Sequence, residues 1–256
     1  MFFVLSPRLD FYPARVLFKW YNEPIMPARG KFIVIEGTDG SGKTEQFSRL
    51  LLRLPEGFSV KTIDFPQYEE PSSYFVREYL NGAYGPLEDE ESGPRRASLF
   101  YALDRFDANE KRLGKWLDGG TTVIANRSVG SSMAHQGGKI RDPRRRQEFF
   151  NWLYDLEFGI CGFPRPDLNI ILHVPAEIAQ ELVDRKAARD YIGGKKRDLH
   201  EGNIEHLRHA EKVYLEIAKL FPENFTVVEC APDGKLLSIE EVHEKVWDIA
   251  KKTLGL

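Results

Sequence analysis

The chain has 256 residues, of which 42 % are hydrophobic and 29 % charged, a size and composition that fit one folded α/β domain and exclude a disordered or membrane-embedded chain. The formal net charge of −3 argues against general attraction to nucleic acid or to acidic lipid, so an anionic ligand must be bound by a local cluster of donors. The two cysteines, Cys161 and Cys230, do not have the spacing of a metal site, and so low a thiol content indicates a reducing compartment such as the cytoplasm.

Residues 1–29 are expected to be an N-terminal extension of one domain that spans residues 30–256. The longest apolar run of the extension, residues 2–5, is far too short for a signal peptide or a membrane span. Met26 opens a segment that leads directly into the first clear strand. We therefore hypothesise that Met26 is the natural start and that the residues before it are mis-assigned or dispensable.

Short apolar runs rich in β-branched residues alternate with helical patterns along the rest of the chain. The expected strands are residues 31–36, 59–64, 121–125, 168–174 and 225–229. The expected helices are residues 43–54, 72–80, 94–117, 143–159, 201–220 and 238–253. This alternation predicts an α/β fold, a doubly wound sheet of five parallel strands flanked by helices. In such folds ligands bind beyond the carboxyl ends of the strands.

The first expected strand ends in a glycine-rich segment that matches the phosphate-loop pattern G-x-x-x-x-G-K-[ST]. The segment reads Gly37-Thr38-Asp39-Gly40-Ser41-Gly42-Lys43-Thr44. Glycines let the backbone curl until its N–H groups point at an anion, and the following helix adds its positive N-terminal end. We expect the segment to bind ATP, Lys43 to reach the oxygens of the transferred phosphate and the Thr44 hydroxyl to ligate Mg²⁺.

Three later segments hold polar and aromatic residues, two of them directly after expected strands and one within the expected helix 94–117. They read Asp64-Phe65-Pro66-Gln67-Tyr68, Leu99-Phe100-Tyr101-Ala102-Leu103-Asp104-Arg105, and Asn126-Arg127-Ser128-Val129-Gly130-Ser131-Ser132-Met133-Ala134-His135-Gln136-Gly137-Gly138. Together with the phosphate loop they resemble the thymidylate kinase family of P-loop nucleoside monophosphate kinases, in order, spacing and composition. The resemblance runs from about Lys31 to the C-terminus. It implies transfer of a phosphoryl group from ATP to dTMP with Mg²⁺ in a cytoplasmic homodimer, with no nucleic-acid or membrane partner.

Tyr101 and Arg105 are four residues apart and therefore face the same side of one helix. The ring can stack on a base while the guanidinium forks onto the monophosphate. Alternatively, Tyr101 lies in the core and Arg105 pairs with Asp104 or Asp107 at the surface. Arg127, directly after a buried strand, is expected to be a second phosphate ligand.

The resemblance implies further substrate contacts. It places Asp39 near the sugar 3′-hydroxyl and His135 where relatives carry an aromatic residue that crowds out a ribose 2′-hydroxyl. The expected substrate-binding residues are Asp39, Phe65, Pro66, Tyr68, Tyr101, Arg105, Arg127, Ser131, Ser132, His135 and Gln136. Of these, Ser131, Ser132 and Gln136 could meet the pyrimidine edge, although helix-face or packing roles remain open for them and for His135.

Residues 184–200 form a basic, glycine-containing segment that we expect to be a lid over both substrates. A solvated charged loop is the alternative. Family members supply a catalytic arginine from the phosphate loop or from this lid, and Gly40 occupies the loop position here. We therefore expect the arginine to be Arg185, Arg189 or Arg197 and favour Arg189 for catalysis beside Lys43 and Arg105, with Arg185 at ATP.

The chain departs from the family pattern at three places. Asn126 replaces the usual aspartate, Ser128 replaces an aromatic residue, and Gln67 and Tyr68 stand where some relatives have an arginine. Asp64 and Asp104 are carboxylates that could compensate. Two alternatives stay open: a deoxynucleoside kinase, because Asn126-Arg127-Ser128 is similar to the Glu-Arg-Ser segment of that group, and a catalytically weak nucleotide-binding homologue. Apolar stretches on the Tyr101 helix and around residues 149–152 could form a dimer interface or belong to the core.

Overall fold

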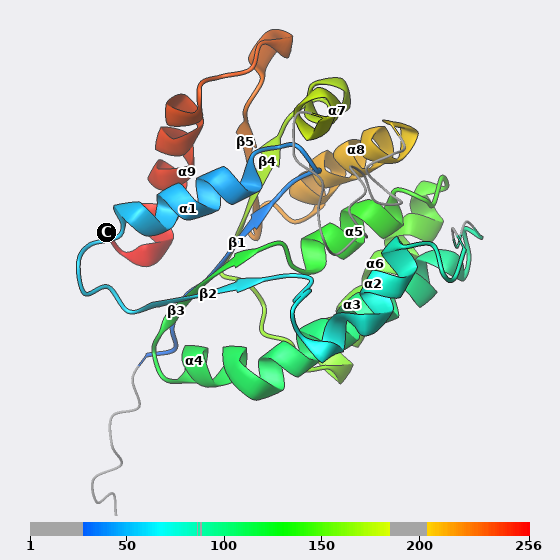
Figure 1. Ribbon diagram of the computed structural model, residues 1–256, viewed down its shortest axis with the longest axis horizontal. Coiled ribbons are helices and arrows are strands. Elements are labelled where there is room, and N and C mark those ends of the chain that lie inside the picture. Colours follow the sequence, from blue (N-terminus) through cyan, green and yellow to red (C-terminus); the bar gives the residue numbers. More distant parts are fainter. Residues whose placement is uncertain (1–27, 86, 88, 185–203) are drawn as a thin grey trace, which may run out of the picture.

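The computed structural model describes residues 28–256 apart from residues 86, 88 and 185–203. Within these residues, five parallel strands form one sheet at the centre of the molecule (Figure 1). Their order is β2-β3-β1-β4-β5, with bounds β1 Phe32–Glu36, β2 Val60–Asp64, β3 Thr122–Asn126, β4 Leu168–His173 and β5 Phe225–Glu229. The prediction of an α/β fold with a five-stranded parallel sheet is confirmed.

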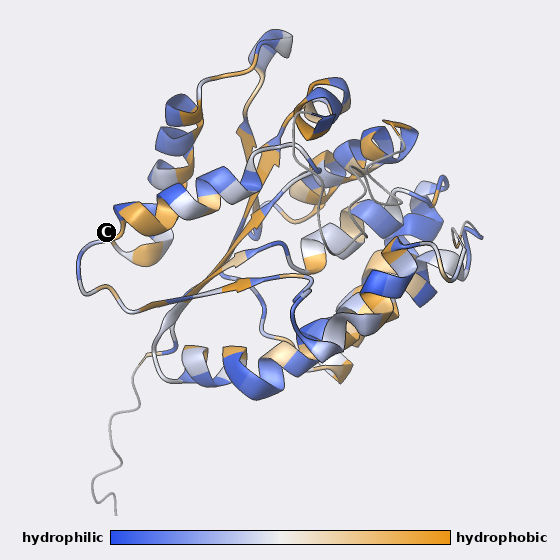
Figure 2. Ribbon diagram, viewed as in Figure 1, coloured by the Kyte–Doolittle hydropathy of each residue, from blue (hydrophilic) through white to orange (hydrophobic). Residues whose placement is uncertain are grey.

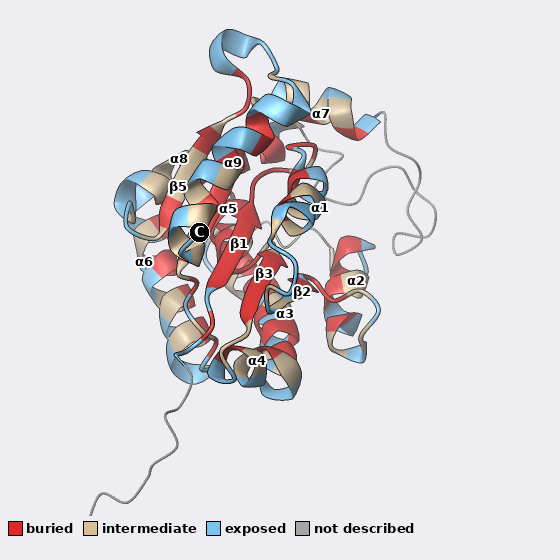
Figure 3. Ribbon diagram, turned by 90° about the vertical axis from the view of Figure 1, so that its left-hand side faces the viewer, coloured by how far each residue is buried: buried red, intermediate tan, exposed pale blue. Residues whose placement is uncertain are grey.

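Both faces of the sheet are covered, and its central strand β1 is buried throughout (Figure 3). Successive side chains of a strand point to opposite faces. Phe32 and Val34 of β1 join one core cluster, whereas Ile33 and Ile35 join the other. Hydropathy follows the same division, with apolar strands inside and helices that turn polar faces to solvent (Figure 2).

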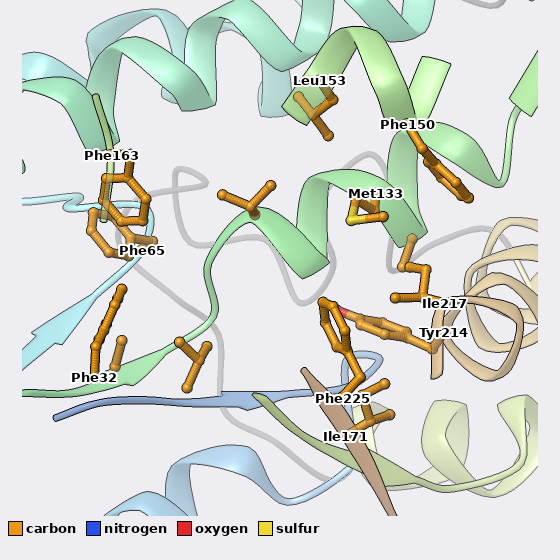
Figure 4. Packing of buried hydrophobic residues seen from close by; sticks show 14 of the residues in the cluster. Phe32, Phe65, Met133, Phe150, Leu153, Phe163, Ile171, Tyr214, Ile217 and Phe225 are labelled. Carbon is orange, nitrogen blue, oxygen red and sulfur yellow. The ribbon is translucent and has the colours of Figure 1, made fainter. Parts of the chain in front are cut away.

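The first core cluster is formed with helices α3 (Gly93–Ala108), α4 (Gly114–Asp118), α5 (Val129–Gly137), α6 (Pro143–Tyr154) and α8 (Ile204–Leu220). Aromatic rings fill much of it, among them Phe32, Phe65 and Phe163 at one end and Tyr214 and Phe225 at the other (Figure 4). The second cluster is formed with α1 (Lys43–Arg53), α7 (Ala176–Asp184) and α9 (Ile239–Leu254). Helix α2 (Tyr74–Leu80) packs on α3 through Val76 and Ala97 in a smaller cluster.

Local signals define several helix ends. Asp142 caps α6 by accepting from the N–H groups of Arg144 and Arg145, with Pro143 at the first helical position. Ser238 and Glu241 form a capping box at the start of α9, which ends at Gly255 with a φ of 73°. No helix among the described residues is both long and apolar enough to cross a membrane.

The predicted helices agree in place but differ in detail. Residues 94–117 are α3 and α4 joined by a π-helical turn (Asn109–Leu113), and α6 continues into a second π-helical turn, Asp155–Ile160. Residues 72–80 begin with a 3₁₀ turn, Pro71–Ser73. The two helices α5 and α7 were not predicted. The sequence of α5, VGSSMAHQG, has low intrinsic helix propensity, so its helical form depends on tertiary contacts.

Candidate active site

A crevice of about 540 Å³ lies at the carboxyl ends of β1, β2 and β3, where the fold predicts a ligand site. It is lined by every residue predicted to bind the substrate: Asp39, Phe65, Pro66, Tyr68, Tyr101, Arg105, Arg127, Ser131, Ser132, His135 and Gln136. Leu80, Asp64, Asn126 and Ser128 line it as well. Residues from five separate segments of the sequence therefore meet in one crevice.

The phosphate loop forms one wall of the crevice. Gly40, Gly42, Lys43 and Thr44 line it, whereas Gly37, Thr38 and Ser41 belong to the loop but do not line it. Gly40 has a φ of 89°, and a Cβ there would lie 2.0 Å from the carbonyl oxygen of Ala179, so only glycine fits. The Lys43 Nζ donates to the Thr38 carbonyl at 2.7 Å and is 4.0 Å from the Asp39 Oδ1.

Arg127 links the phosphate loop to the opposite wall. It follows β3 in a left-handed conformation with a φ of 68°. Its Nη1 donates to the Gly37 carbonyl and to the Ser131 Oγ, each at 3.2 Å, and its Nη2 donates to Asp39. Burial is the largest single effect and disfavours the charged guanidinium, but Asp39, Tyr214, Glu36 and Tyr68 together outweigh it and raise the pKa of Arg127. The charge is therefore held beside the loop.

Arg105 is almost wholly buried and forms a two-pronged ion pair with Glu157 of the second π-helical turn. The Arg105 Nε lies 3.0 Å from the Glu157 Oε2, and the Arg105 Nη2 also donates to the Ser132 Oγ at 2.9 Å. The alternative of a surface pair with Asp104 or Asp107 is therefore wrong. The fork that was predicted to bind a monophosphate holds a carboxylate of the chain itself.

Asp104 anchors the segment that follows β2. Its Oδ2 accepts from the Gln67 N–H at 2.8 Å, and its Oδ1 accepts from the Ser72 hydroxyl at 2.6 Å. The peptide bond between Phe65 and Pro66 is cis. These contacts hold the segment against α3, which carries Tyr101. Asp104 is 1 % exposed, and both of its carboxylate oxygens already accept hydrogen bonds. It therefore does not supply the negative charge that is lost where Asn126 replaces the usual aspartate.

Glu36, at the end of β1, organises the start of α5, and nothing in the sequence analysis identified this role. It is fully buried and accepts from the N–H groups of Ser128 and Ser131 at 2.8 and 3.1 Å. The hydroxyls of Ser131 and Tyr214 donate to its Oε2 at 2.6 and 2.9 Å. Glu36 thus caps α5 with a negative charge and ties α8 to it. A carboxylate inside an otherwise apolar strand was the available signal.

His135 is buried in the crevice wall and stacks on His206 of α8. Its Nδ1 lies 3.2 Å from the His206 Nε2, and its Nε2 lies 3.4 Å from the Arg127 Nη1. Because Arg127 can only donate, the His135 Nε2 accepts and the Nδ1–H points to His206. Burial, followed by the positive charge of Arg127, holds the pKa of His135 well below its usual value. The ring is therefore neutral at pH 7.

The crevice offers oxygen ligands that fit a magnesium–nucleotide complex. Thr44, Asp64 and Asn126 line it, and the Asn126 Oδ1 is buried without a hydrogen-bond partner. The described residues contain no cluster of three or more histidine, cysteine or acidic side chains that could hold a metal alone. Mg²⁺ fits such a site, because it keeps several waters and is usually bound through one or two carboxylates and the substrate phosphates. Arg185, Arg189 and Arg197 lie outside the described residues.

Comparison with known proteins identifies the family. A family model described as thymidylate kinase matches residues 35–246. Thymidylate kinase from Mycobacterium tuberculosis is 32 % identical over 188 residues, which cover 73 % of this chain and 85 % of that protein. A probable thymidylate kinase from Pyrococcus horikoshii is 30 % identical over 231 residues, covering 89 % and 100 % of the two chains. The solved structure of thymidylate kinase from Candida albicans has the same fold, with a TM-score of 0.66 at 24 % identity over 88 % of this chain and 92 % of that one. This chain belongs to the thymidylate kinase family.

Proposed function

We propose that the protein is a thymidylate kinase that transfers the γ-phosphoryl group of ATP to the 5′-phosphate of dTMP, giving dTDP and ADP for dTTP biosynthesis. The observation that carries this proposal is the contact between Arg127 and the phosphate loop, 3.2 Å from the guanidinium to the Gly37 carbonyl. Arg127 and the phosphate loop, which are both suited to bind phosphate, thereby face one crevice. Such a reaction needs positioning and charge stabilisation more than covalent chemistry by the protein.

On the donor side, residues 37–44 would hold the ATP phosphates with backbone N–H groups and Lys43. Mg²⁺, when bound, would neutralise charge on the phosphates, and the Thr44 hydroxyl would be its ligand in the loop. Arg189 of the basic segment is our candidate for the arginine that stabilises the transferring group, because Gly40 cannot serve. Such an arginine contributes on the order of 10³–10⁵ in rate.

On the acceptor side, Arg127 is the better candidate for the dTMP phosphate, because the Arg105 fork already holds Glu157. Tyr101 and Tyr68 would meet the base, and Asp39 the sugar. The Gln136 Oε1 is a buried acceptor at the crevice with no hydrogen-bond partner among the described residues. The N3–H of thymine is a donor that would satisfy it, and the Arg105–Ser132 pair suits a pyrimidine carbonyl.

A homodimer in the cytoplasm completes the proposal. Leu99, Leu103 and Phe106 lie on one face of α3 and are 41 %, 52 % and 42 % exposed, and Phe75 of α2 is 46 % exposed. The three residues on α3, which we call the α3 face, form an apolar surface suited to a second copy of the chain. Both cysteines are free thiols, which agrees with a reducing compartment.

An ADP-release assay with dTMP, thymidine, dUMP and other nucleoside monophosphates tests the reaction, with Lys43→Ala as the blank. We expect turnover of dTMP and none in the blank. Turnover of thymidine but not of dTMP would establish a deoxynucleoside kinase instead. Tight binding of ATP and dTMP without release of ADP would establish a catalytically inactive homologue.

A further inference from the structure

Two acidic side chains line the crevice, and only one of them faces cations. Asp39 is paired with Arg127 and lies 4.0 Å from the Lys43 Nζ. Asp64 accepts a hydrogen bond from the Asn126 Nδ2 at 2.8 Å, and an amide carries no charge. Within the described part of the chain, no lysine or arginine forms an ion pair with Asp64.

The other carboxylates around the crevice are each used within the protein. Asp104 binds the segment after β2, Glu36 caps α5, and Glu157 holds Arg105. Asp64 therefore presents a charge that no cationic side chain of the described residues balances, in a crevice built to receive phosphates. A carboxylate beside phosphates is repelled unless a cation lies between them.

The partner of Asp64 supplies a second oxygen. Asp64 and Asn126 are opposite each other in the parallel pair of β2 and β3, so both stand at the same edge of the sheet. Because the Asn126 amide turns its nitrogen to Asp64, its buried Oδ1 is left without a hydrogen-bond partner. A carboxylate oxygen beside an amide oxygen is a donor set that a hydrated Mg²⁺ prefers.

We propose that Asp64 is a positioning residue that holds the hydrated Mg²⁺ of the nucleotide complex, with Asn126 as its partner. The inference rests on the proposed kinase function. Relatives carry a negatively charged residue after β3. In this chain Asp64, on the neighbouring strand β2, supplies that charge, and the hydrogen bond from Asn126 orients its carboxylate. The chain thereby keeps the charge at the sheet edge although Asn126 has replaced the usual aspartate.

The test exchanges the two side chains. Asp64→Asn removes the charge, whereas the double variant Asp64→Asn/Asn126→Asp moves it to β3 and keeps the hydrogen bond with donor and acceptor reversed. Asp118→Asn, an exposed acid on α4, is the matched control. Mn²⁺ is the probe, and its affinity is measured by electron paramagnetic resonance in the presence of ADP and dTMP, where no turnover occurs. Thermal melting confirms that each variant is folded.

We expect Asp64→Asn to weaken Mn²⁺ binding by about 10-fold or more and to raise the Mg²⁺ concentration that half-saturates turnover. The double variant should recover most of both losses, and Asp118→Asn should equal the wild type. Unchanged Mn²⁺ affinity in Asp64→Asn, or a double variant no better than the single one, would overturn the proposal. Mn²⁺ binding is measured without turnover. A wild type that fails to phosphorylate dTMP would therefore refute the proposed function, whereas the Mn²⁺ affinities would still test the role of Asp64.

Discussion

Arg105 and Glu157 are oppositely charged side chains from which water is excluded, 2 % and 0 % exposed. Burying a charge is costly unless a partner of good geometry offsets it, so removing one member leaves the other charge uncompensated. Glu157→Ala should therefore lower the free energy of unfolding by about 3–5 kcal/mol, measured by urea denaturation.

The control for that variant removes both charges. Arg105→Met/Glu157→Leu replaces the pair by apolar side chains of similar volume and should recover most of the lost stability. A single variant as stable as the wild type would mean that the pair is not held away from water in solution.

Gln136 allows a prediction about the substrate. The Gln136→Met variant keeps the side-chain volume but removes the buried acceptor that we assign to the thymine N3–H. We expect the Kd of dTMP to rise by about 5- to 150-fold, the equivalent of about 1–3 kcal/mol, with the Kd of ATP unchanged in calorimetric titrations. Gln147→Met, on the surface of α6, is the matched control. An unchanged Kd for dTMP would exclude Gln136 from base recognition.

At this scale the sequence predicts the position of a residue where the geometry is local. The phosphate loop and the Tyr101–Arg105 spacing each lie within one segment, so their geometry follows from glycine conformations and the helical repeat. The residues that it missed act across long separations. Glu157 is 52 residues from Arg105, Glu36 is 92 residues from Ser128, and His206 is 71 residues from His135. Such pairs arise from tertiary packing and leave no spacing to read.

At the scale of elements, His173 joins β4 to α8 and β5. Its Nε2 lies 2.9 Å from the Glu211 Oε1 and its Nδ1 lies 2.5 Å from the Glu229 Oε2, and Glu211 also accepts from the Ala176 N–H at the start of α7. The hydrogen bond with Glu211, opposed by partial burial and helped by Glu229, raises the pKa of His173 to about 8. The charged imidazolium thus ties three elements together.

The raised pKa predicts a dependence of stability on pH. The stabilisation is fully present below the unfolded-state pKa of about 6.5 and is lost as the pH rises through about 8. His173→Gln should lower the free energy of unfolding by about 1 kcal/mol at pH 6, a modest value because Glu229 is 41 % exposed. The difference should nearly vanish at pH 9. His209→Gln, exposed on the same α8, should show no such trend. A deficit independent of pH would contradict the assignment.

The strands could be predicted because buried parallel strands are continuous apolar runs. The helices were harder to predict from the sequence. Helix α5 contains glycines and serines that disfavour a helix, and it forms because Glu36 caps its first turn while α8 and α6 pack on it. Helix α7 does carry an apolar stripe, Ile178 and Leu182 with Ala179 and Val183, and could have been predicted. The π-helical turn that presents Glu157 depends on packing, and its sequence has no distinct pattern.

For the whole molecule, the strand order explains why the crevice lies where it does. In the sheet, β2 and β3 lie on one side of β1, and β4 and β5 lie on the other. The carboxyl ends of β2, β3 and β1 therefore stand side by side at one edge of the sheet. The alternation of strands and helices predicts this class of fold, and the right-handed crossover rule narrows its topology. The sequence left the apolar stretches on the Tyr101 helix and around residues 149–152 open as a dimer interface or as core. Only the fold separates them, because Phe149 and Phe150 are buried whereas Leu103 on the Tyr101 helix is exposed.

The α3 face gives the prediction that belongs to this scale. An i, i+4, i+7 row of exposed leucine and phenylalanine costs solvation free energy in a monomer, and a second copy would remove it from water. We expect the wild type to sediment at twice its chain mass of 29.4 kDa. Leu103→Glu places charge at the centre of the face and should shift the protein to the monomer in sedimentation velocity at micromolar concentration. Leu52→Glu on α1, where the leucine is 86 % exposed and distant from this face, should leave the dimer intact. If Leu103→Glu sediments as a dimer, the interface uses another surface; if dTMP turnover persists in the monomer, each crevice works without its partner.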